Sequence, residues 1–444
     1  MPIPHLSAEI WQNILEQVEA HIEAEQSNMQ QERSHLYVRT LYNFCLTNKT
    51  LCFMAQPLLY KSWTDKYSTD RPLKHYHKFL RTLIERPDLA SRVRKAVVKA
   101  SWAPVLGGAL ISDYQEYVDD STLSQMVKDD AKRFVTDGEK SRCWLERCSL
   151  GHIDALIVLV LHHLPNLETL DIRAQIFDCV VDILWYPDPD PEYHGGNHNI
   201  VLQKLRKVVI AHNHDNETNV NKLGQFYFIA LPVLACSLPN VSEVKVIGNL
   251  NVWAMPQHLD FPPDIFTPFV TSITEIRLQD SYIDPGDIWL LLDFYRGLEV
   301  FEVSWSSRFD NEDFNFVGPV LKEYLNPSQT TLRHLKFDVG QMLYQDIDGT
   351  IRDPEDFAEF EPIGDLSGFT NLTHLTIDGL LLFGDHESFT ETLRQFGWVH
   401  VTSQLPRTLI YLQITGRVSG YDVDGLKAAC AENLPGLKSI LVKL

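Results

Sequence analysis

Two aspartates separated by a single residue, Asp346 and Asp348, form the carboxylate pair of this chain with the clearest potential for covalent chemistry. One carboxylate could attack a phosphoryl group and the other could transfer the proton, with a magnesium ion bound between them. That chemistry requires a buried apolar strand that ends at the pair. Here the preceding residues 342–345 (MLYQ) are few, and the segment 338–365 holds nine acidic residues against one basic residue. The pattern favours a turn in an acidic loop.

The same stretch, 346–350 (DIDGT), also matches the nucleophile signature of haloacid-dehalogenase-like phosphatases. In that family the motif lies early in a Rossmann-like domain with much chain after it, whereas only 94 residues follow Thr350. The stretch does not fit a calcium-binding EF-hand either, because its glycine comes too early and no glutamate completes the loop. A hydrolase built on this pair remains a third interpretation, behind two interpretations without catalysis.

Histidines and aspartates gather in two polar stretches and could bind zinc, because zinc accepts imidazole and carboxylate ligands. Their spacing fits no standard zinc site. The seven cysteines are scattered, and Cys143 and Cys148 favour core thiols over a redox pair. No phosphate-binding glycine loop or hydrolase motif is present, so the sequence predicts a protein that is not an enzyme and has no cofactor and no metal. The polar group comprises His194, His198, His212 and His214 with Asp188, Asp190 and Asp215.

Charge is distributed unevenly along the 444 residues, whose net charge is -20. Residues 1–100 carry 14 basic and 10 acidic side chains, whereas residues 101–444 carry 25 and 49, a balance of -24. Such an acidic region repels phosphate groups, which argues against nucleic acid and membrane surfaces as partners. The N-terminus lacks a signal-peptide pattern, and the longest apolar run, 155–161, is too short to span a bilayer. These features predict a soluble protein of the cytoplasm, the nucleus or both.

One phrase recurs from Leu167 onward: apolar, two residues, apolar, one residue, apolar. Nine copies begin 25 to 40 residues apart, and Val93, Ala96 and Val98 resemble a degenerate earlier copy. A short strand repeated at such intervals, with helical stretches between, predicts a stacked repeat protein. The copies are Leu167/Leu170/Ile172, Leu205/Val208/Ile210, Val241/Val244/Val246, Ile273/Ile276/Leu278, Leu298/Phe301/Val303, Leu332/Leu335/Phe337, Leu372/Leu375/Ile377, Leu409/Leu412/Ile414 and Leu437/Ile440/Val442.

Alternate strand residues face opposite sides of a sheet, so the second and third apolar residues of each phrase point into the core. The residues beside them then form an open, concave sheet face that is polar and mixed in charge. This face could bind a protein, or its residues could merely keep the sheet soluble. The predicted substrate-binding residues are Glu243, Lys245, Glu275, Arg277, Glu302, His334, Lys336, His374 and Tyr411.

The first sixty residues predict a small bundle of three helices. Ser7 can cap the first helix, whose apolar residues recur every fourth position from Ile10 to Ile22. A second amphipathic stretch runs from Leu36 to Cys45. Thr47 or Asn48 can cap a third helix, which Pro57 is expected to end near Gln56. We therefore predict three regions: a helical domain at 1–60, linker helices with irregular first repeats at 61–150, and the repeat region at 151–444.

The helical domain resembles an F-box, the module that docks substrate receptors onto the Skp adaptor of cullin–RING ubiquitin ligases. Residues 6–10 (LSAEI) line up with the family opening Leu-Pro-x-Glu-Ile, and Ile14-Leu15 and Val18 follow it. Residues 41–49 (LYNFCLTNK) resemble the second half of the module. Ser7 replaces the usual proline, and the polar segment 23–34 lengthens the gap between the halves.

The repeat region resembles leucine-rich repeats of a divergent type, without the asparagine ladder usual in that family. The two resemblances together imply an α/β solenoid, a horseshoe with a parallel sheet on its concave face, preceded by a small all-α F-box-like bundle. They imply a non-catalytic substrate receptor of an SCF-type ligase, with the Skp-family adaptor and an unknown protein substrate as partners. The alternative is a leucine-rich-repeat scaffold whose bundle only caps the repeats. The expected adaptor-binding residues are Leu6, Ile10, Ile14, Leu15, Leu41 and Leu46.

Overall fold

The chain divides into two compact units: unit 1 comprises Met1–Lys99, Val105–Asp171 and Val201–Lys204, and unit 2 comprises Ala100–Pro104, Ile172–Ile200 and Leu205–Leu444. The domain boundaries expected at residues 60 and 150 stay predictions. The computed structural model describes residues 10, 11, 13–15, 17, 31–64, 72–98, 121–134, 145, 153–173, 202–211, 224–227, 240–248, 250–253, 272–283, 285–305, 318–339, 361–384, 386–416 and 422–442.

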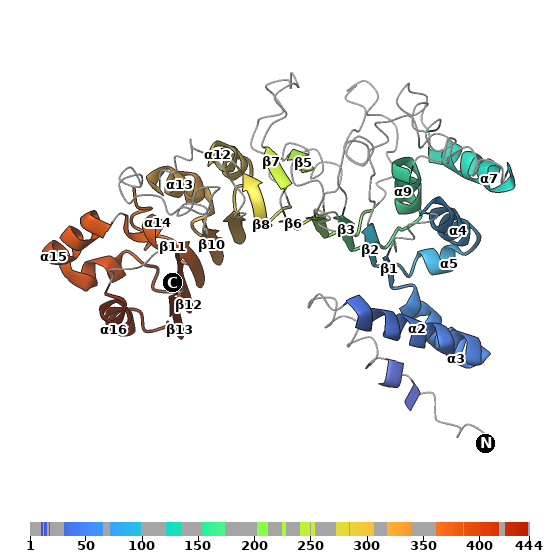
Figure 1. Ribbon diagram of the computed structural model, residues 1–444, viewed down its shortest axis with the longest axis horizontal. Coiled ribbons are helices and arrows are strands. Elements are labelled where there is room, and N and C mark those ends of the chain that lie inside the picture. Colours follow the sequence, from blue (N-terminus) through green and yellow to red (C-terminus); the bar gives the residue numbers. More distant parts are fainter. Residues whose placement is uncertain are drawn as a thin grey trace, which may run out of the picture. The chain divides into compact units, whose positions relative to one another are not determined.

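Unit 2 is built on parallel strands that follow one another in chain order, as the repeated phrase predicts (Figure 1). Each strand is hydrogen-bonded to the next in a parallel register, and the structure describes helices in four of the seven intervals between them. This arrangement confirms a repeated α/β architecture, whereas the expected horseshoe curvature stays a prediction. The strands are β4 (Lys207–Ala211), β6 (Glu243–Ile247), β8 (Glu275–Ile283), β9 (Val300–Trp305), β10 (His334–Asp338), β11 (His374–Asp378), β12 (Tyr411–Thr415) and β13 (Ser439–Val442).

The apolar phrase forms the core of unit 2. In the copy around β10, Leu332, Leu335 and Phe337 are fully buried, while the residues between them are half-buried or exposed. The three apolar residues of the other copies are likewise buried, except in the last copy, where they are only half-buried. Among the strands that the structure describes, β13 has a neighbour on one side alone, so its apolar residues have no further described layer packed against them.

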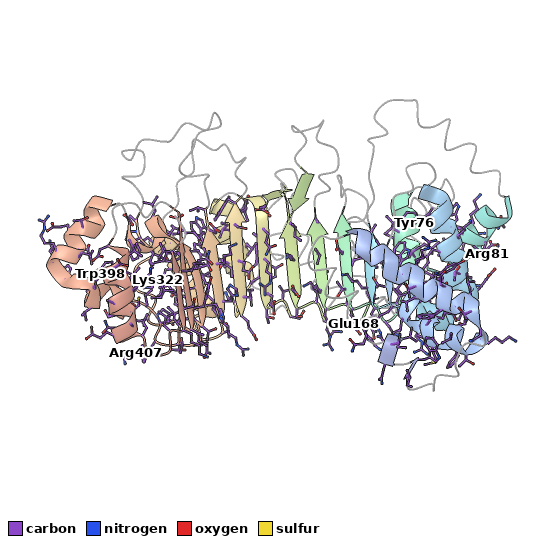
Figure 2. All side chains as sticks on the ribbon, turned by 60° about the horizontal axis from the view of Figure 1, so that its bottom comes forward. Tyr76, Arg81, Glu168, Lys322, Trp398 and Arg407 are labelled. Atoms are coloured by element: carbon purple, nitrogen blue, oxygen red, sulfur yellow. The ribbon has the colours of Figure 1, made fainter. Side chains whose placement is uncertain are left out.

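The helices of unit 2 lie along one side of these strands (Figure 1). They supply the apolar surface that covers the buried residues, which leaves the opposite strand residues on an open face. Near the C-terminus Trp398 bridges two helices, since its Nε1 lies 3.4 Å from Asp422 Oδ2 (Figure 2). The helices are α12 (Pro285–Phe294), α13 (Gly318–Leu325), α14 (Gly379–Phe383), α15 (His386–Ser403) and α16 (Val423–Asn433), with the 3-10 turn η5 (Asn326–Ser328) after α13.

A second set of short strands interrupts the simple repeat. β5 (Gly224–Tyr227) pairs in parallel with β7 (Leu250–Trp253), and β7 pairs with the end of β8. Residues 226–236 form one of the stretches between phrases whose sequence predicts a helix, which is wrong for Phe226 and Tyr227 because they belong to β5. A four-residue strand depends on its partners for stability, and local apolar spacing does not reveal such pairing.

Unit 1 contains β1 (Ser62–Thr64), β2 (Lys95–Val98) and the first three residues of β3 (Thr169–Arg173), in that sheet order. The degenerate phrase is confirmed as a repeat strand, because Ala96 and Val98 are fully buried in β2. On α4 the buried Tyr76 packs edge-on against Trp63, and Arg81 forms an exposed ion pair with Glu85 (Figure 2). The helices are α4 (Pro72–Glu85), α5 (Pro87–Ala90), α7 (Ser121–Ala131) and α9 (Ile153–His162), with the 3-10 turn η1 (Lys132–Phe134).

The helical bundle of unit 1 joins α2 (Gln31–Thr47) to α3 (Lys49–Leu59) through the single residue Asn48. The Asn48 side chain accepts a hydrogen bond from the Leu51 N–H at 2.8 Å, which confirms the expected cap. Two details differ from expectation: α2 already includes residues 31–34, and α3 continues through Pro57. Pro57 lies in the last turn of α3. Its missing N–H costs one backbone hydrogen bond, and no later turn of the helix depends on that bond.

A half-buried histidine should make the stability of unit 1 depend on pH. His162 lies at the end of α9, with Nδ1 2.8 Å from the Val158 carbonyl, and burial lowers its pKa below 6.5. The unfolded chain takes up the proton near pH 6.5 and the folded chain only at lower pH, so stability should fall as the pH drops below 6.5. Urea unfolding from pH 7.5 to 5 should show this loss, and His162→Gln should reduce the slope. Equal slopes for both proteins would contradict the prediction.

Candidate functional site

The nine residues predicted to bind a substrate form two adjacent rows across the open face of unit 2. The strand register aligns one residue of each strand with its neighbour, and each row runs across the strands. The predicted set omits Lys207, although it precedes Val208 as Glu243 precedes Val244. The first row is Lys207, Glu243, Glu275, Val300, His334, His374 and Tyr411, and the second row is Val209, Lys245, Arg277, Glu302, Lys336, Thr376 and Gln413.

Glu302 lies at the centre of an ion-pair network on this face. Its carboxylate accepts a hydrogen bond from Arg277 Nη1, and Arg277 Nη2 pairs with Glu275 Oε2 at 3.1 Å. The Nε2 atom of His334 is 3.6 Å from Glu302 Oε1. Glu302 is only 5% exposed, so its charge depends on these neighbours. The sequence predicts that Glu302 contacts a substrate. In the structure Glu302 instead lies below the surface and orients Arg277 and His334.

Removing the charge of Glu302 should destabilise unit 2. In Glu302→Gln the side chain keeps its size, but Arg277 loses its buried counter-ion, and we expect a loss of about 1–3 kcal/mol in the free energy of unfolding. Glu299→Gln is the matched control, because Glu299 pairs with Arg333 at 3.5 Å in an exposed position, where about 0–1 kcal/mol is expected. Urea denaturation of both variants measures the difference. Equal losses would show that the network does not need the buried carboxylate.

Three rings form a ladder on β10, β11 and β12, at the end of the first row. The centroids of His334 and His374 are 5.5 Å apart, and those of His374 and Tyr411 are 6.0 Å apart. Burial is the largest cause that lowers the pKa of His334, with Arg277, His374 and Lys336 adding to it and Glu302 opposing it. Burial therefore favours the neutral form of His334. The ladder offers a flat, partly apolar surface beside the charged part of the face.

The predicted adaptor-binding residues fall into two classes. Leu15 and Leu41 are 2% and 1% exposed and form a core with Ala55. They hold the bundle together and do not present their side chains to a partner. Ile10 and Leu46 are exposed, and Ile14 is half-buried. Leu6 lies outside the described residues.

Three exposed apolar residues recur every fourth position along α2: Val38, Tyr42 and Leu46, which we call the α2 stripe. Tyr42 is 53% exposed and Leu46 is 67% exposed, while on α3 Phe53 is 82% exposed. Residues four apart lie on one face of a helix, so the stripe is continuous along α2. Of these three residues only Leu46 belongs to the predicted adaptor-binding set, although the four-residue spacing of Val38, Tyr42 and Leu46 is visible in the sequence. The bundle thus has an apolar surface beside its own core.

Several motifs identified in the sequence lie outside the described residues: the Asp346/Asp348 pair, Cys143 and Cys148, and the histidine and aspartate group of 188–215. Within the part of the chain that the structure describes, no group of three or more His, Cys, Asp or Glu residues could hold a metal ion. A search of those same residues finds no helix with the length and apolar character needed to cross a membrane.

Comparison with known proteins identifies no relative by sequence. No family model matches the chain, and no curated protein matches it. Among solved structures the chain is similar to one in the crystal structure of the Rad7 and Elc1 complex in yeast, at 13% identity. The match covers 77% of this chain and 95% of that chain, with a TM-score of 0.22. Because this TM-score is so low, the match carries no weight in the arguments that follow.

Proposed function

We propose that this chain is a non-catalytic substrate receptor of an SCF-type cullin–RING ubiquitin ligase. The bundle would dock onto a Skp-family adaptor, and the open face of the sheet in unit 2 would bind a target protein. The receptor would hold the target where the ubiquitin-conjugating enzyme of the ligase can reach a lysine on it. The contribution of this chain is proximity, and none of its residues needs to do covalent chemistry.

The observation that carries the proposal is the exposed apolar surface of the bundle. Among the described residues nine large hydrophobic side chains are exposed, and five of them lie between Ile10 and Phe53. A bundle that only capped the repeats would bury such residues against them, whereas a docking module keeps them accessible for its partner. The F-box resemblance falls on the same segment, which is why an adaptor of the Skp family is the proposed occupant.

Some residues of α2 pack inside the bundle while others face outward, and this supports docking by a preformed surface. Leu41 packs with Leu15 and Ala55, and Trp11 meets Phe44 edge-on with ring centroids 5.5 Å apart. These contacts fix the helix, while the α2 stripe remains outside them. A preformed apolar surface loses little conformational entropy on binding, which favours a stable complex.

Co-expression of the full chain with a Skp adaptor, followed by size-exclusion chromatography, tests the proposal. We expect a stable complex of one receptor and one adaptor. If the chain is folded, as circular dichroism can show, and elutes without the adaptor, the ligase role fails. The chain would then be a repeat scaffold without a ubiquitin-ligase role.

A further inference from the structure

The cations on the open face of unit 2 differ in whether they have a counter-ion. Lys207 forms an ion pair with Glu243 on the neighbouring strand, and Arg277 pairs with both Glu275 and Glu302. Further along the second row Lys336 Nζ is 3.7 Å from Asp338 Oδ2. The carboxylates on these strands are therefore already engaged by cations.

Lys245 lies in the middle of this set without an ion pair to any residue that the structure describes. Its neighbours along the second row are Val209 on β4 and Arg277 on β8, so it faces an apolar side chain on one side and a cation on the other. The side chain is half-buried. Burial is the largest cause that lowers its pKa, Lys207 and Arg277 add to the effect, and Glu302 and Glu243 oppose it.

A partly desolvated ammonium group beside two further cations is an unfavourable arrangement for the chain alone. An anion placed against Lys245 would relieve the repulsion and replace the lost hydration of the ammonium group. Removal from water also makes such a pair stronger than one between fully exposed groups. Among the described residues Lys245 has no such partner, although residues 101–444 carry a balance of -24 (25 basic minus 49 acidic) and acidic side chains are abundant elsewhere in the sequence.

We propose that Lys245, next to Arg277 along its row and diagonal to Lys207, is a subsite for an anionic group, a carboxylate or a phosphate, of a protein segment that lies across β4, β6 and β8. This inference deepens the proposed function and rests on it in one respect, that a target protein occupies the open face. A nucleic acid would offer the same phosphate chemistry, but the net charge of the chain repels a long polyanion. A protein segment can offer one acidic or phosphorylated residue without that repulsion.

The neighbouring surface fits an extended segment of this kind. The ring ladder of His334, His374 and Tyr411 begins three strands from Lys245, in the order β6, β8, β9, β10. Parallel strands lie about 4.8 Å apart, so the distance is roughly 14 Å, which about five residues of extended chain would span. In the bound segment, an acidic residue would lie at Lys245, and a residue at the far end of this five-residue span would stack on the rings.

A small-anion titration of the full-length chain tests the subsite without adaptor, ligase or target. Reductive ¹³C-methylation labels every lysine and keeps its charge, and Lys245→Arg identifies the Lys245 signal by its loss. Sodium phosphate and sodium acetate would be titrated separately at constant ionic strength made up with chloride. We expect a saturable shift of the Lys245 signal and a rise in its titration midpoint, with at least a threefold weaker response of Lys322 on α13. Acetate and phosphate together distinguish a carboxylate site from a phosphate site.

The titration has outcomes that overturn the proposal. A Lys245 signal that does not shift with either anion, or that shifts no more than the Lys322 signal, would show that no anion subsite exists. Lys207→Met provides a second test, because it frees Glu243 to neutralise Lys245 from within the chain. The anion response of Lys245 should then fall by at least threefold, and an unchanged response would contradict the assigned geometry. None of these results depends on whether the bundle binds an adaptor.

Discussion

Tyr42→Asp combined with Leu46→Asp should reduce adaptor binding by at least about a hundredfold while the bundle remains folded. Truncating a central interface residue typically costs about 2 kcal/mol or more, and 1.4 kcal/mol corresponds to a factor of ten in affinity. Aspartate also places a charge where the adaptor would present an apolar surface. Tyr42 and Leu46 are exposed in the free chain, so their replacement removes no core contact. Isothermal titration calorimetry with the purified adaptor measures the effect.

Two comparison variants separate docking from folding. Phe396→Asp combined with Val399→Asp changes two exposed apolar residues of α15, which are 59% and 62% exposed, and should leave adaptor affinity unchanged. Leu41→Asp places a charge in the core of the bundle and should lower its helical content as well as its binding. If the Tyr42 and Leu46 double variant keeps wild-type affinity, the α2 stripe is not the docking surface.

Phe337→Ala should destabilise unit 2 by about 3–5 kcal/mol, the cost of removing a large aromatic side chain from a core. Phe337 is fully buried, and its ring lies 5.2 Å from that of Trp305 and 6.2 Å from that of Phe301. In a stacked repeat each layer depends on its neighbours, so amides of β9 and β11 should also exchange faster. Urea unfolding and hydrogen exchange measure the two effects.

The exposed Phe396 provides the control for this prediction. Phe396→Ala on α15 removes the same group from the surface and should change stability by less than about 0.5 kcal/mol. A similar small loss for Phe337→Ala would mean that the ring is not part of a continuous core. Faster exchange confined to β10 would argue against coupling between neighbouring repeats.

The repeat strands could be predicted because each phrase satisfies a local rule. Leu335 and Phe337 alternate with polar residues, and this period of two forms a strand whose buried side is fixed by the sequence. A helix between phrases can also have its own periodicity, as in α16, where Leu426, Ala429 and Cys430 are buried. The strands β1, β5 and β7 were not predicted, because three or four residues carry too little pattern and depend on distant partners for stability.

The candidate site could be predicted in outline but not in its energetics. The alternation places Lys245 and Glu302 on the open face, yet only the cross-strand register shows that Glu302 is paired with Arg277 and Lys245 is not. In the bundle, apolar residues occur on more than one side of α2. The spacing alone could not show that Leu41 packs inward while Leu46 faces outward.

Hydrogen–deuterium exchange of the full chain, with and without the Skp adaptor, tests whether the bundle is the docking module. We expect slower exchange within 31–59, which contains α2 and α3, and unchanged exchange in strands β6 to β12, because the open face stays free for a target. No protection within 31–59 at saturating adaptor would contradict the claim, as would protection confined to the sheet strands.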